Sequence, residues 1–309
     1  MLCGWRILSE VPLTGVPTSL NNQGNIDVVI DIATGQPPVV KTAGRFVFQH
    51  STECSLIKIQ DVADFEIRDG RQIRIWPAVS ATQKDIEIFL LGPAWATLCH
   101  QRGTLPLHAS AIVTGTGVTA FVGRSGVGKS MTAGLLNSFG YELIADDILP
   151  VSFDRNSIPG AWPYLRRLKL HRDPIIQLAL TPGERVSETL DKDKYFVHSK
   201  TAGDNKWRRL ERVFLLENQQ THSSTPIEQI TGADAVHALV DQTYHFKFVV
   251  DTQRFGHHLN FCTRLASKIP IYRLHRSPLT DTGERLHFLI RTHAAGKTNT
   301  SAEAALDSE

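Results

Sequence analysis

Eight residues near the middle of the chain have the types and the spacing that bind phosphate. The run Gly123-Arg124-Ser125-Gly126-Val127-Gly128-Lys129-Ser130 fits the pattern G-x-x-x-x-G-K-[S/T] at every fixed position. Glycines let successive backbone N–H groups turn toward one anion, and the start of a helix adds partial positive charge. Lys129 is then expected to reach the β- and γ-phosphates of a nucleotide, and the Ser130 hydroxyl to complete a Mg²⁺ shell.

The neighbouring segments suit such a P-loop. Val118–Val122 is mainly apolar and predicts a buried strand entering the loop, and Met131–Asn137 predicts a helix leaving it. We expect nucleotide contacts from Gly123 through Met131. The alternative is a glycine-rich turn between strand and helix that holds no ligand.

Two carboxylates follow the next predicted strand. Gly140 is placed to end the helix, Tyr141–Ala145 predicts a short strand, and Asp146 and Asp147 come directly after it. An acid at a strand end beside a P-loop can hold Mg²⁺ or accept a proton from an attacking hydroxyl. The alternative is a solvated turn.

Composition excludes several other classes of protein. The 309 residues carry a formal net charge of +2 and no long run of Lys or Arg, which disfavours nucleic acid and anionic membranes as partners. The four cysteines form no C-x-x-C pair, so neither a zinc site nor a disulfide framework is indicated. No apolar run is long enough for a membrane span, and we expect a cytoplasmic protein.

The first part of the chain reads as a small β-rich domain over residues 1–91. Short strands are expected at Asp27–Ile32, Arg45–Phe48 and Leu56–Ile59, and a hairpin at Phe65–Arg68 and Gln72–Trp76 around Asp69-Gly70. Its exposed charges suit a solvated sheet face, although a role in substrate docking stays open.

A second domain is expected over residues 92–292. Gly92-Pro93 predicts the start of a helix that runs to about Gln101 and connects the domains. Leu107–Val113 predicts a strand, and the tight turn 114–117 makes it an antiparallel partner of the strand that enters the P-loop.

The later part of this domain predicts strands at Val213–Leu216 and Ile271–Leu274 and helices near Ala233–Val240 and His257–Ser267. Residues 293–309 read as a disordered tail. Two basic strips could supply a cation to transition-state oxygens, but a charged surface is the simpler interpretation. The strips consist of Arg166, Arg167, Lys169, His171, Arg172, and of Lys200, Lys206, Arg208, Arg209.

The sequence resembles the catalytic domain of the HPr kinase/phosphorylase family. The likeness covers Leu105 to about Leu149: Leu-His108-Ala-Ser before a hairpin, then Gly-Lys129-Ser130, then Ile-Ala-Asp146-Asp147 one helix and one strand later. More loosely, the layout is similar to HPr-kinase-related proteins of peptide-tailoring clusters, including kinases of lasso peptide precursors. The resemblance implies an α/β P-loop fold related to phosphoenolpyruvate carboxykinase, behind a small β-rich N-terminal domain.

Position by position, the resemblance implies an active-site role for His108, phosphate contacts for Lys129, and a general base at Asp147 with Asp146 in support. Ser130 and Asp146 would hold Mg²⁺, and ATP would be the phosphate donor. His108 is followed by Ala109 where the family has Gly, and the family's downstream Glu-bearing segment has no clear match. The reverse, dephosphorylating reaction and HPr as the substrate are therefore not carried over.

Three functions remain open at this point. The first is an ATP-dependent kinase that phosphorylates a Ser or Thr of a protein or peptide, and the second is a nucleotide-binding regulatory or assembly module with weak ATPase activity. A small-molecule kinase is the third. The sequence leaves the oligomeric state open, a homo-oligomer included.

Overall fold

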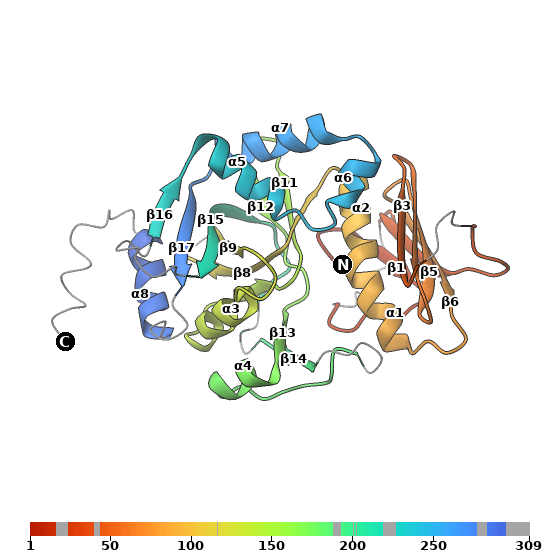
Figure 1. Ribbon diagram of the computed structural model, residues 1–309, viewed down its shortest axis with the longest axis horizontal. Coiled ribbons are helices and arrows are strands. Elements are labelled where there is room, and N and C mark those ends of the chain that lie inside the picture. The colour runs from red at the N-terminus through yellow and green to blue at the C-terminus, as the bar shows by residue number, and fades with distance from the viewer. Residues whose placement is uncertain are drawn as a thin grey trace.

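The computed structural model describes residues 1–16, 24–39, 44–115, 117–187, 193–199, 201, 203–218, 227–276 and 283–294. Two sheets lie at opposite sides of the molecule, and a helical stretch stands between them (Figure 1). The fold is mixed α/β with a β-rich N-terminal part, as expected. Position 116 of the predicted turn, Lys200 of the second basic strip and residues 295–309 of the predicted tail lie outside the described residues.

The N-terminal sheet has the strand order β1-β2-β6-β5-β4-β3. Its strands are β1 (Ile7–Ser9), β2 (Val28–Ile32), β3 (Phe46–His50), β4 (Cys54–Ile59), β5 (Ala63–Arg68) and β6 (Gln72–Pro77). Strands β5 and β6 form the expected antiparallel hairpin. Asp69 and Gly70 at its turn have φ of 52° and 61°, the left-handed values that a tight two-residue turn needs.

The helix expected from Gly92 begins nine residues earlier. Helix α1 (Gln83–Phe89) runs through the π-helical segment η1 (Leu90–Ala94) into α2 (Trp95–Gln101). The Thr82 hydroxyl accepts the Asp85 N–H and so provides an N-cap that the sequence interpretation missed. The kink is at Gly92, with φ −109° and ψ −108°, so Pro93 lies inside the helical stretch and does not begin it. The domain boundary predicted after residue 91 falls at this kink.

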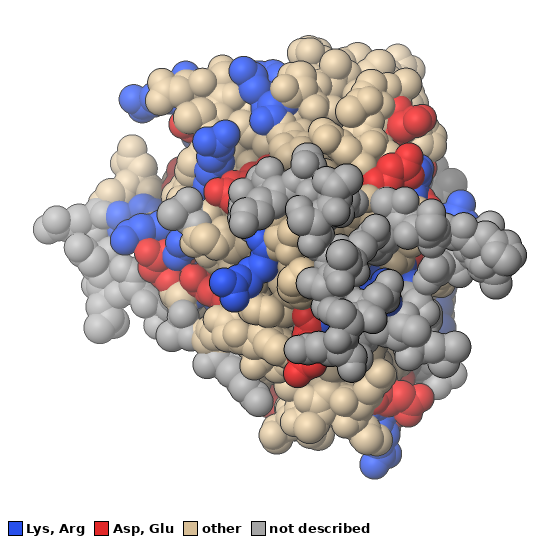
Figure 2. All heavy atoms as spheres, turned by 90° about the vertical axis from the view of Figure 1, so that its left-hand side faces the viewer, with Lys and Arg blue, Asp and Glu red and all other residues tan. Residues whose placement is uncertain are grey.

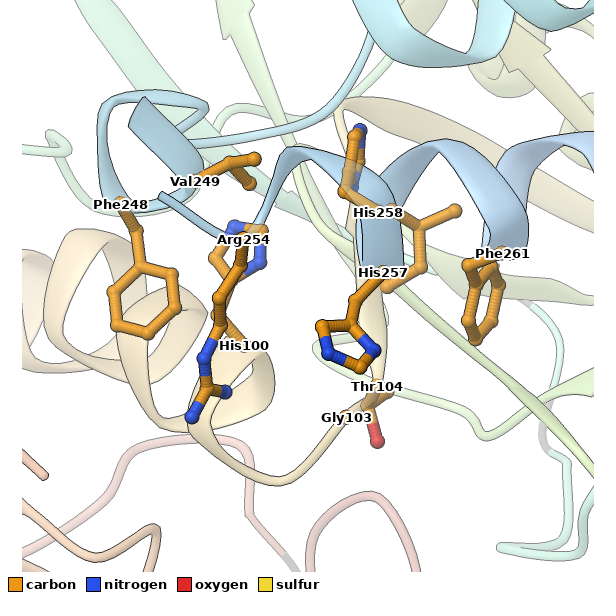
Figure 3. Close-up of a pocket in the computed structure, with 10 residues that line it drawn as sticks. His100, Gly103, Thr104, Phe248, Val249, Arg254, His257, His258 and Phe261 are labelled. Atoms are coloured by element: carbon orange, nitrogen blue, oxygen red, sulfur yellow. The ribbon is translucent and has the colours of Figure 1, made fainter. Parts of the chain in front are cut away.

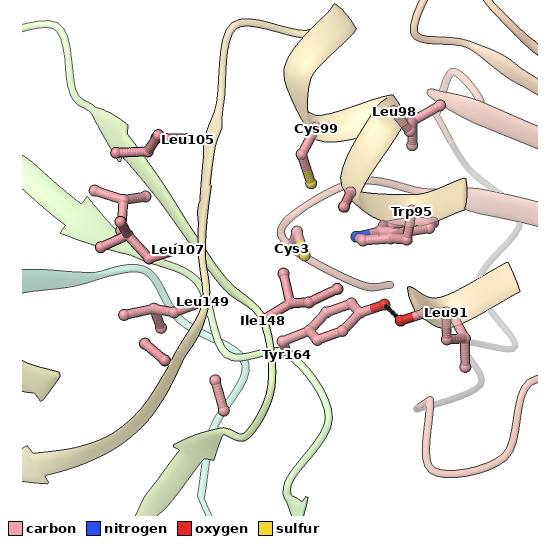
Figure 4. Close-up of a cluster of buried hydrophobic side chains, with 14 of the residues drawn as sticks. Cys3, Leu91, Trp95, Leu98, Cys99, Leu105, Leu107, Ile148, Leu149 and Tyr164 are labelled. Carbon is pink, nitrogen blue, oxygen red and sulfur yellow. Dashed lines mark hydrogen bonds between the residues drawn. The ribbon is translucent and has the colours of Figure 1, made fainter. Parts of the chain in front are cut away.

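The helical stretch packs onto both sheets through a shared hydrophobic core. Trp95 is fully buried beside Cys3 and Cys99, and the Tyr164 hydroxyl donates to the Leu91 carbonyl at 2.7 Å (Figure 4). Leu107 and Leu149 of the second sheet belong to the same cluster. The N-terminal part is therefore joined to the rest through a continuous hydrophobic core.

The second sheet carries the P-loop. Its order is β10-β8-β9-β15-β12-β11-β7, with β17 beside β15 and β16 beside β17. The strands are β7 (Leu105–Leu107), β8 (Ala109–Thr114), β9 (Gly117–Val122), β10 (Leu143–Ala145), β11 (Leu149–Phe153), β12 (Pro159–Ala161), β15 (Arg208–Asn218), β16 (Ile227–Ile230) and β17 (Ile271–Arg276). Strand β9 is antiparallel to β8 and parallel to β15, which confirms the hairpin before the loop.

The single strand expected over Leu107–Val113 is wrong. Strand β7 pairs with β11, whereas β8 pairs with β9 and β10, and the chain changes partners at His108. The His108 N–H bonds instead to the Gln242 carbonyl at 2.7 Å. A tertiary contact thus interrupts a run whose apolar residues favoured one strand.

Helices cover both faces of this sheet, which explains why every residue of β9 is buried. Phe121 packs with α3 (Lys129–Ser138) and α8 (Gly283–Ala294), and Ala120 faces the core of α5 (Gly232–Asp241) and α7 (Phe255–Ala266). The remaining elements are α4 (Arg172–Gln177), α6 (Lys247–Asp251) and the ribbon of β13 (Arg167–His171) and β14 (Lys194–His198).

On the face shown in Figure 2, basic and acidic side chains are interspersed among uncharged ones. No helix in the described part of the chain is long and apolar enough to cross a membrane.

Candidate active site

The P-loop joins the end of β9 to the start of α3. Gly123, Gly126 and Gly128 have φ of 144°, 87° and 98°, a region that side chains rarely occupy. A Cβ on Gly123 would lie 2.7 Å from the Leu216 carbonyl oxygen, and one on Gly128 would lie 2.5 Å from Nη1 of Arg276. All three glycines are therefore required by the backbone conformation, and Gly123 and Gly128 also by close packing around the loop.

Lys129 is buried in the concave side of this loop. Its Nζ donates to the carbonyl oxygens of Gly123 and Arg124 at 2.7 and 3.3 Å. Burial lowers the pKa of Lys129, while Asp147 and Asp146 act to raise it. The ammonium group thus lies among the loop's own backbone groups, where phosphate oxygens would compete for it.

Asp146 is buried and receives three donors. The hydroxyls of Ser130 (2.8 Å) and Ser110 donate to its Oδ1, and the Lys169 N–H donates to its Oδ2 at 2.8 Å. Burial raises the pKa of Asp146, and the hydrogen bonds from Ser110 and Lys169 offset part of that effect. The P-loop serine and the strand-end acid, both predicted as metal ligands, are in direct contact.

Asp147 lies beside Asp146 and between two cationic or potentially cationic groups. Its Oδ2 accepts from Lys169 Nζ at 2.7 Å, and its Oδ1 is 3.5 Å from His108 Nε2. Burial acts to raise the pKa of Asp147, but the Lys169 ammonium, followed by His108 and Lys194, brings it below its ordinary value. Asp147 has a φ of 80°, an uncommon conformation outside glycine that recurs where function positions a side chain.

His108 completes the group. Burial and the Lys129 charge lower the pKa of His108 to about 4, although Asp147 acts to raise it. The imidazole is therefore neutral at pH 7, and it meets the Tyr244 ring edge-on at 5.5 Å. The structure thus brings together His108, Lys129, Ser130, Asp146 and Asp147, as the spacing predicted, while their roles stay proposals.

Three contributors were missed by the sequence interpretation. Ser110 lies two residues after His108, at the start of β8. Lys169 belongs to a basic strip that was interpreted mainly as charged surface. Gln242 links the site to α5: its Oε1 accepts the Gly123 N–H at 3.1 Å, and its carbonyl accepts from His108. No local pattern marks Gln242, because its importance comes only from tertiary position.

Most of the basic strips have structural partners. Arg166 bonds to Glu142 at 3.1 Å, and Arg167 bonds to the buried Glu87 at 3.1 Å. Arg208 also bonds to Glu142, at 3.3 Å. Lys169 is the member whose ammonium contacts an active-site acid.

A cavity of about 890 Å³ adjoins the P-loop. Its lining includes Arg124, Ser125, Gly126 and Val127 of the loop together with Gln242 of the segment after α5. Met131, in the first turn of α3, and the acids Asp146 and Asp147 are outside this lining. The cavity is large enough for a nucleoside.

Two oxygen atoms beside the loop are placed to bind Mg²⁺. Ser130 Oγ and Asp146 Oδ1 are 2.8 Å apart, close to the roughly 2.9 Å that separates adjacent oxygen ligands of an octahedral Mg²⁺ ion. The described residues hold no cluster of three or more His, Cys, Asp or Glu side chains suited to a metal ion. Two protein oxygens supplemented by phosphates and water are typical of Mg²⁺ bound with a nucleotide.

No family model matches the chain, and no curated protein matches it by sequence. The structure is similar to that of the HPr(Ser) kinase/phosphatase from Coxiella burnetii, with 12% sequence identity and a TM-score of 0.35. The match covers 62% of this chain and 91% of the other.

Proposed function

We propose that this chain is an ATP-dependent kinase that transfers the γ-phosphate to a Ser or Thr hydroxyl of a protein or peptide. The observation that carries the proposal is the position of Asp147, an ionised acid with a lowered pKa in the same cluster as a P-loop lysine. A site that only binds nucleotide has no need of such a base. The sequence resemblance to HPr kinases supports the same reaction.

In the proposed reaction, the acceptor hydroxyl gives its proton to Asp147 as its oxygen bonds to the γ-phosphorus. The bond from that phosphorus to the β,γ-bridging oxygen breaks, and ADP leaves. Lys129 and backbone N–H groups within residues 124–130 neutralise charge on the phosphates. Mg²⁺, held by Ser130 and Asp146, would neutralise the remaining phosphate charge.

Lys169 and His108 position the base. Lys169 holds both acids, Asp146 through its backbone N–H and Asp147 through its ammonium group. Neutral His108 approaches the second oxygen of Asp147, so the carboxylate is held from two sides. In the proton-accepting step, a lone pair of the Asp147 carboxylate that these partners leave unused accepts the substrate hydroxyl.

The cytoplasm is the proposed location, because ATP is available there and the four cysteines are free thiols. A Ser/Thr-bearing peptide is the proposed partner.

A transfer assay with γ-labelled ATP and Mg²⁺, run on a panel of Ser- and Thr-containing peptides, tests the proposal. Label in a peptide, lost when its acceptor Ser or Thr is replaced by Ala, is the expected result. Label found only in inorganic phosphate would favour the nucleotide-binding module with weak ATPase activity. Label in a small metabolite would favour the third candidate.

A further inference from the structure

A second cavity, of about 340 Å³, lies apart from the P-loop between α2, α6 and α7. Arg254 and His257 project from the start of α7 toward the turn at Gly103 and Thr104, with Phe248 and Phe261 to either side (Figure 3). Apolar walls with a few convergent polar groups are typical of small-molecule sites, and this volume suits a compact ligand.

The polar part of this cavity includes the Arg254 guanidinium, which carries a charge, and three imidazoles, of which His100 is neutral at pH 7 because burial lowers its pKa to about 4. Arg254, His257, His100 and His258 line it, and the lining contains no carboxylate. Within the described residues neither Arg254 nor His257 has an ion-pair partner, and the nearby Asp251 is paired with Lys247 at 2.8 Å. A guanidinium group without a carboxylate partner is suited to a bidentate contact with a carboxylate or phosphate.

The two buried histidines of the cavity connect it to the active site. His258 Nε2 is 3.2 Å from the Thr243 hydroxyl, and His100 Nε2 is 2.9 Å from the Tyr244 carbonyl, so it donates there. The segment they hold begins at Gln242, whose side chain accepts the Gly123 N–H of the P-loop. Its carbonyl holds His108.

We propose that this cavity is an effector site for a small organic anion, a carboxylate or phosphate on a compact apolar body. Arg254 and His257 bind the anionic group, and Phe248 and Phe261 contact the apolar body. The bound anion restrains His100 and His258, and through residues 242–244 it restrains the first residues of the P-loop. The binding itself does not depend on phosphate transfer.

Calorimetric titration of the full chain with phenylacetate, phenyl phosphate and neutral benzyl alcohol tests the binding. We expect saturable binding of at least one anion below roughly 10 mM and weaker binding of the alcohol. Arg254→Met should lower the anion affinity about tenfold or more, because it removes charge-assisted hydrogen bonds and keeps most of the side-chain stem. Arg291→Met, an exposed residue of α8, is the matched control.

The two anions distinguish which anionic group the effector carries. Tighter binding of phenyl phosphate indicates a phosphate monoester, and tighter binding of phenylacetate indicates a carboxylic acid. Equal affinity for the alcohol, unchanged affinity in Arg254→Met, or no saturation by either anion would overturn the proposal.

Amide hydrogen exchange of residues 123–130 tests the connection without any nucleotide. The better-binding anion should slow exchange in this segment by about fivefold or more in the wild type. Gln242→Met should still bind the anion but lose this protection, because its side chain no longer accepts the Gly123 N–H. Equal exchange with and without anion in the wild type would refute the effector role. Failure of the kinase assay alone would affect only the proposed function.

Discussion

At the scale of single residues, Lys129 is the most direct test of the P-loop. Its ammonium group contacts two loop carbonyls and no core side chain. We therefore expect Lys129→Ala to retain the fold by circular dichroism and to lower phosphate transfer on the order of a hundredfold or more. Lys206→Ala, at an exposed lysine, is the matched control. Activity within about tenfold of wild type would exclude Lys129 from the transition state.

Asp147 distinguishes a transferase from a nucleotide binder. Asp147→Asn keeps the size of the side chain, and Asn tolerates the positive φ of this position, so the backbone should not change. Transfer should fall by roughly 10²- to 10⁴-fold because the base is lost, while affinity for a non-hydrolysable ATP analogue changes far less.

Ser130→Ala provides the contrast, because it removes a proposed Mg²⁺ ligand and should weaken binding of the Mg²⁺ complex of that analogue. Calorimetry beside the transfer assay measures both effects. Full transfer activity in Asp147→Asn would move the base elsewhere, with Asp146 as the next candidate.

At the scale of elements, the segment from α1 to α2 depends on a cap that lies far from the P-loop motif. The Thr82 hydroxyl accepts the Asp85 N–H at 3.1 Å and donates to the Asp85 carboxylate at 2.7 Å. Thr82→Ala should lower the free energy of unfolding by about 1 kcal/mol, measured by urea denaturation, with nucleotide affinity unchanged. Thr82→Ser retains the hydroxyl and should retain most of the stability. Equal stability of Ala and Ser variants would show that the cap contributes little.

The hairpin of β8 and β9 positions active-site residues beside the P-loop. Because β8 runs antiparallel to β9, its first residues lie beside the end of β9, where the P-loop begins. Ser110 at this point reaches Asp146, and His108 just before it reaches Asp147. A wholly parallel arrangement would place the start of the neighbouring strand at the opposite edge of the sheet.

At the scale of the whole molecule, buried histidines at the junction of the N-terminal sheet with α2 and α6 make stability sensitive to acid. Burial lowers the pKa of His50 and of His100 to about 4. Between pH 6.5 and 4 the unfolded chain binds protons that the folded chain excludes, so stability falls as pH falls. Neither ring nitrogen of His50 has a hydrogen-bond partner in the described structure.

His50→Leu should therefore reduce the loss of Tm between pH 7 and pH 5, because it removes one group that must stay neutral when buried. The matched control is His237→Leu, because the His237 side chain on α5 is 74% exposed and its removal should change the pH dependence much less. Thermal melts followed by circular dichroism across this range provide the measurement. An identical pH slope in His50→Leu and wild type would contradict the assignment.

The sequence by itself determined the loop, the element on either side of it and the acids that follow, because each depends on residues close together in the chain. Glycine spacing specifies backbone geometry locally, and the Asp69-Gly70 turn specified a hairpin for the same reason. His108, Lys129 and Asp147 were selected by spacing, and the structure places them together.

Only the tertiary structure decided which distant groups complete the site. The break in the strand at His108 depends on a backbone contact with Gln242, and the two acids depend on Lys169, 22 residues after Asp147. Such contacts leave no periodicity in the sequence. The start of α1 was missed because Gly92-Pro93 looks like a helix boundary, whereas packing against both sheets stabilises one kinked helical stretch through it.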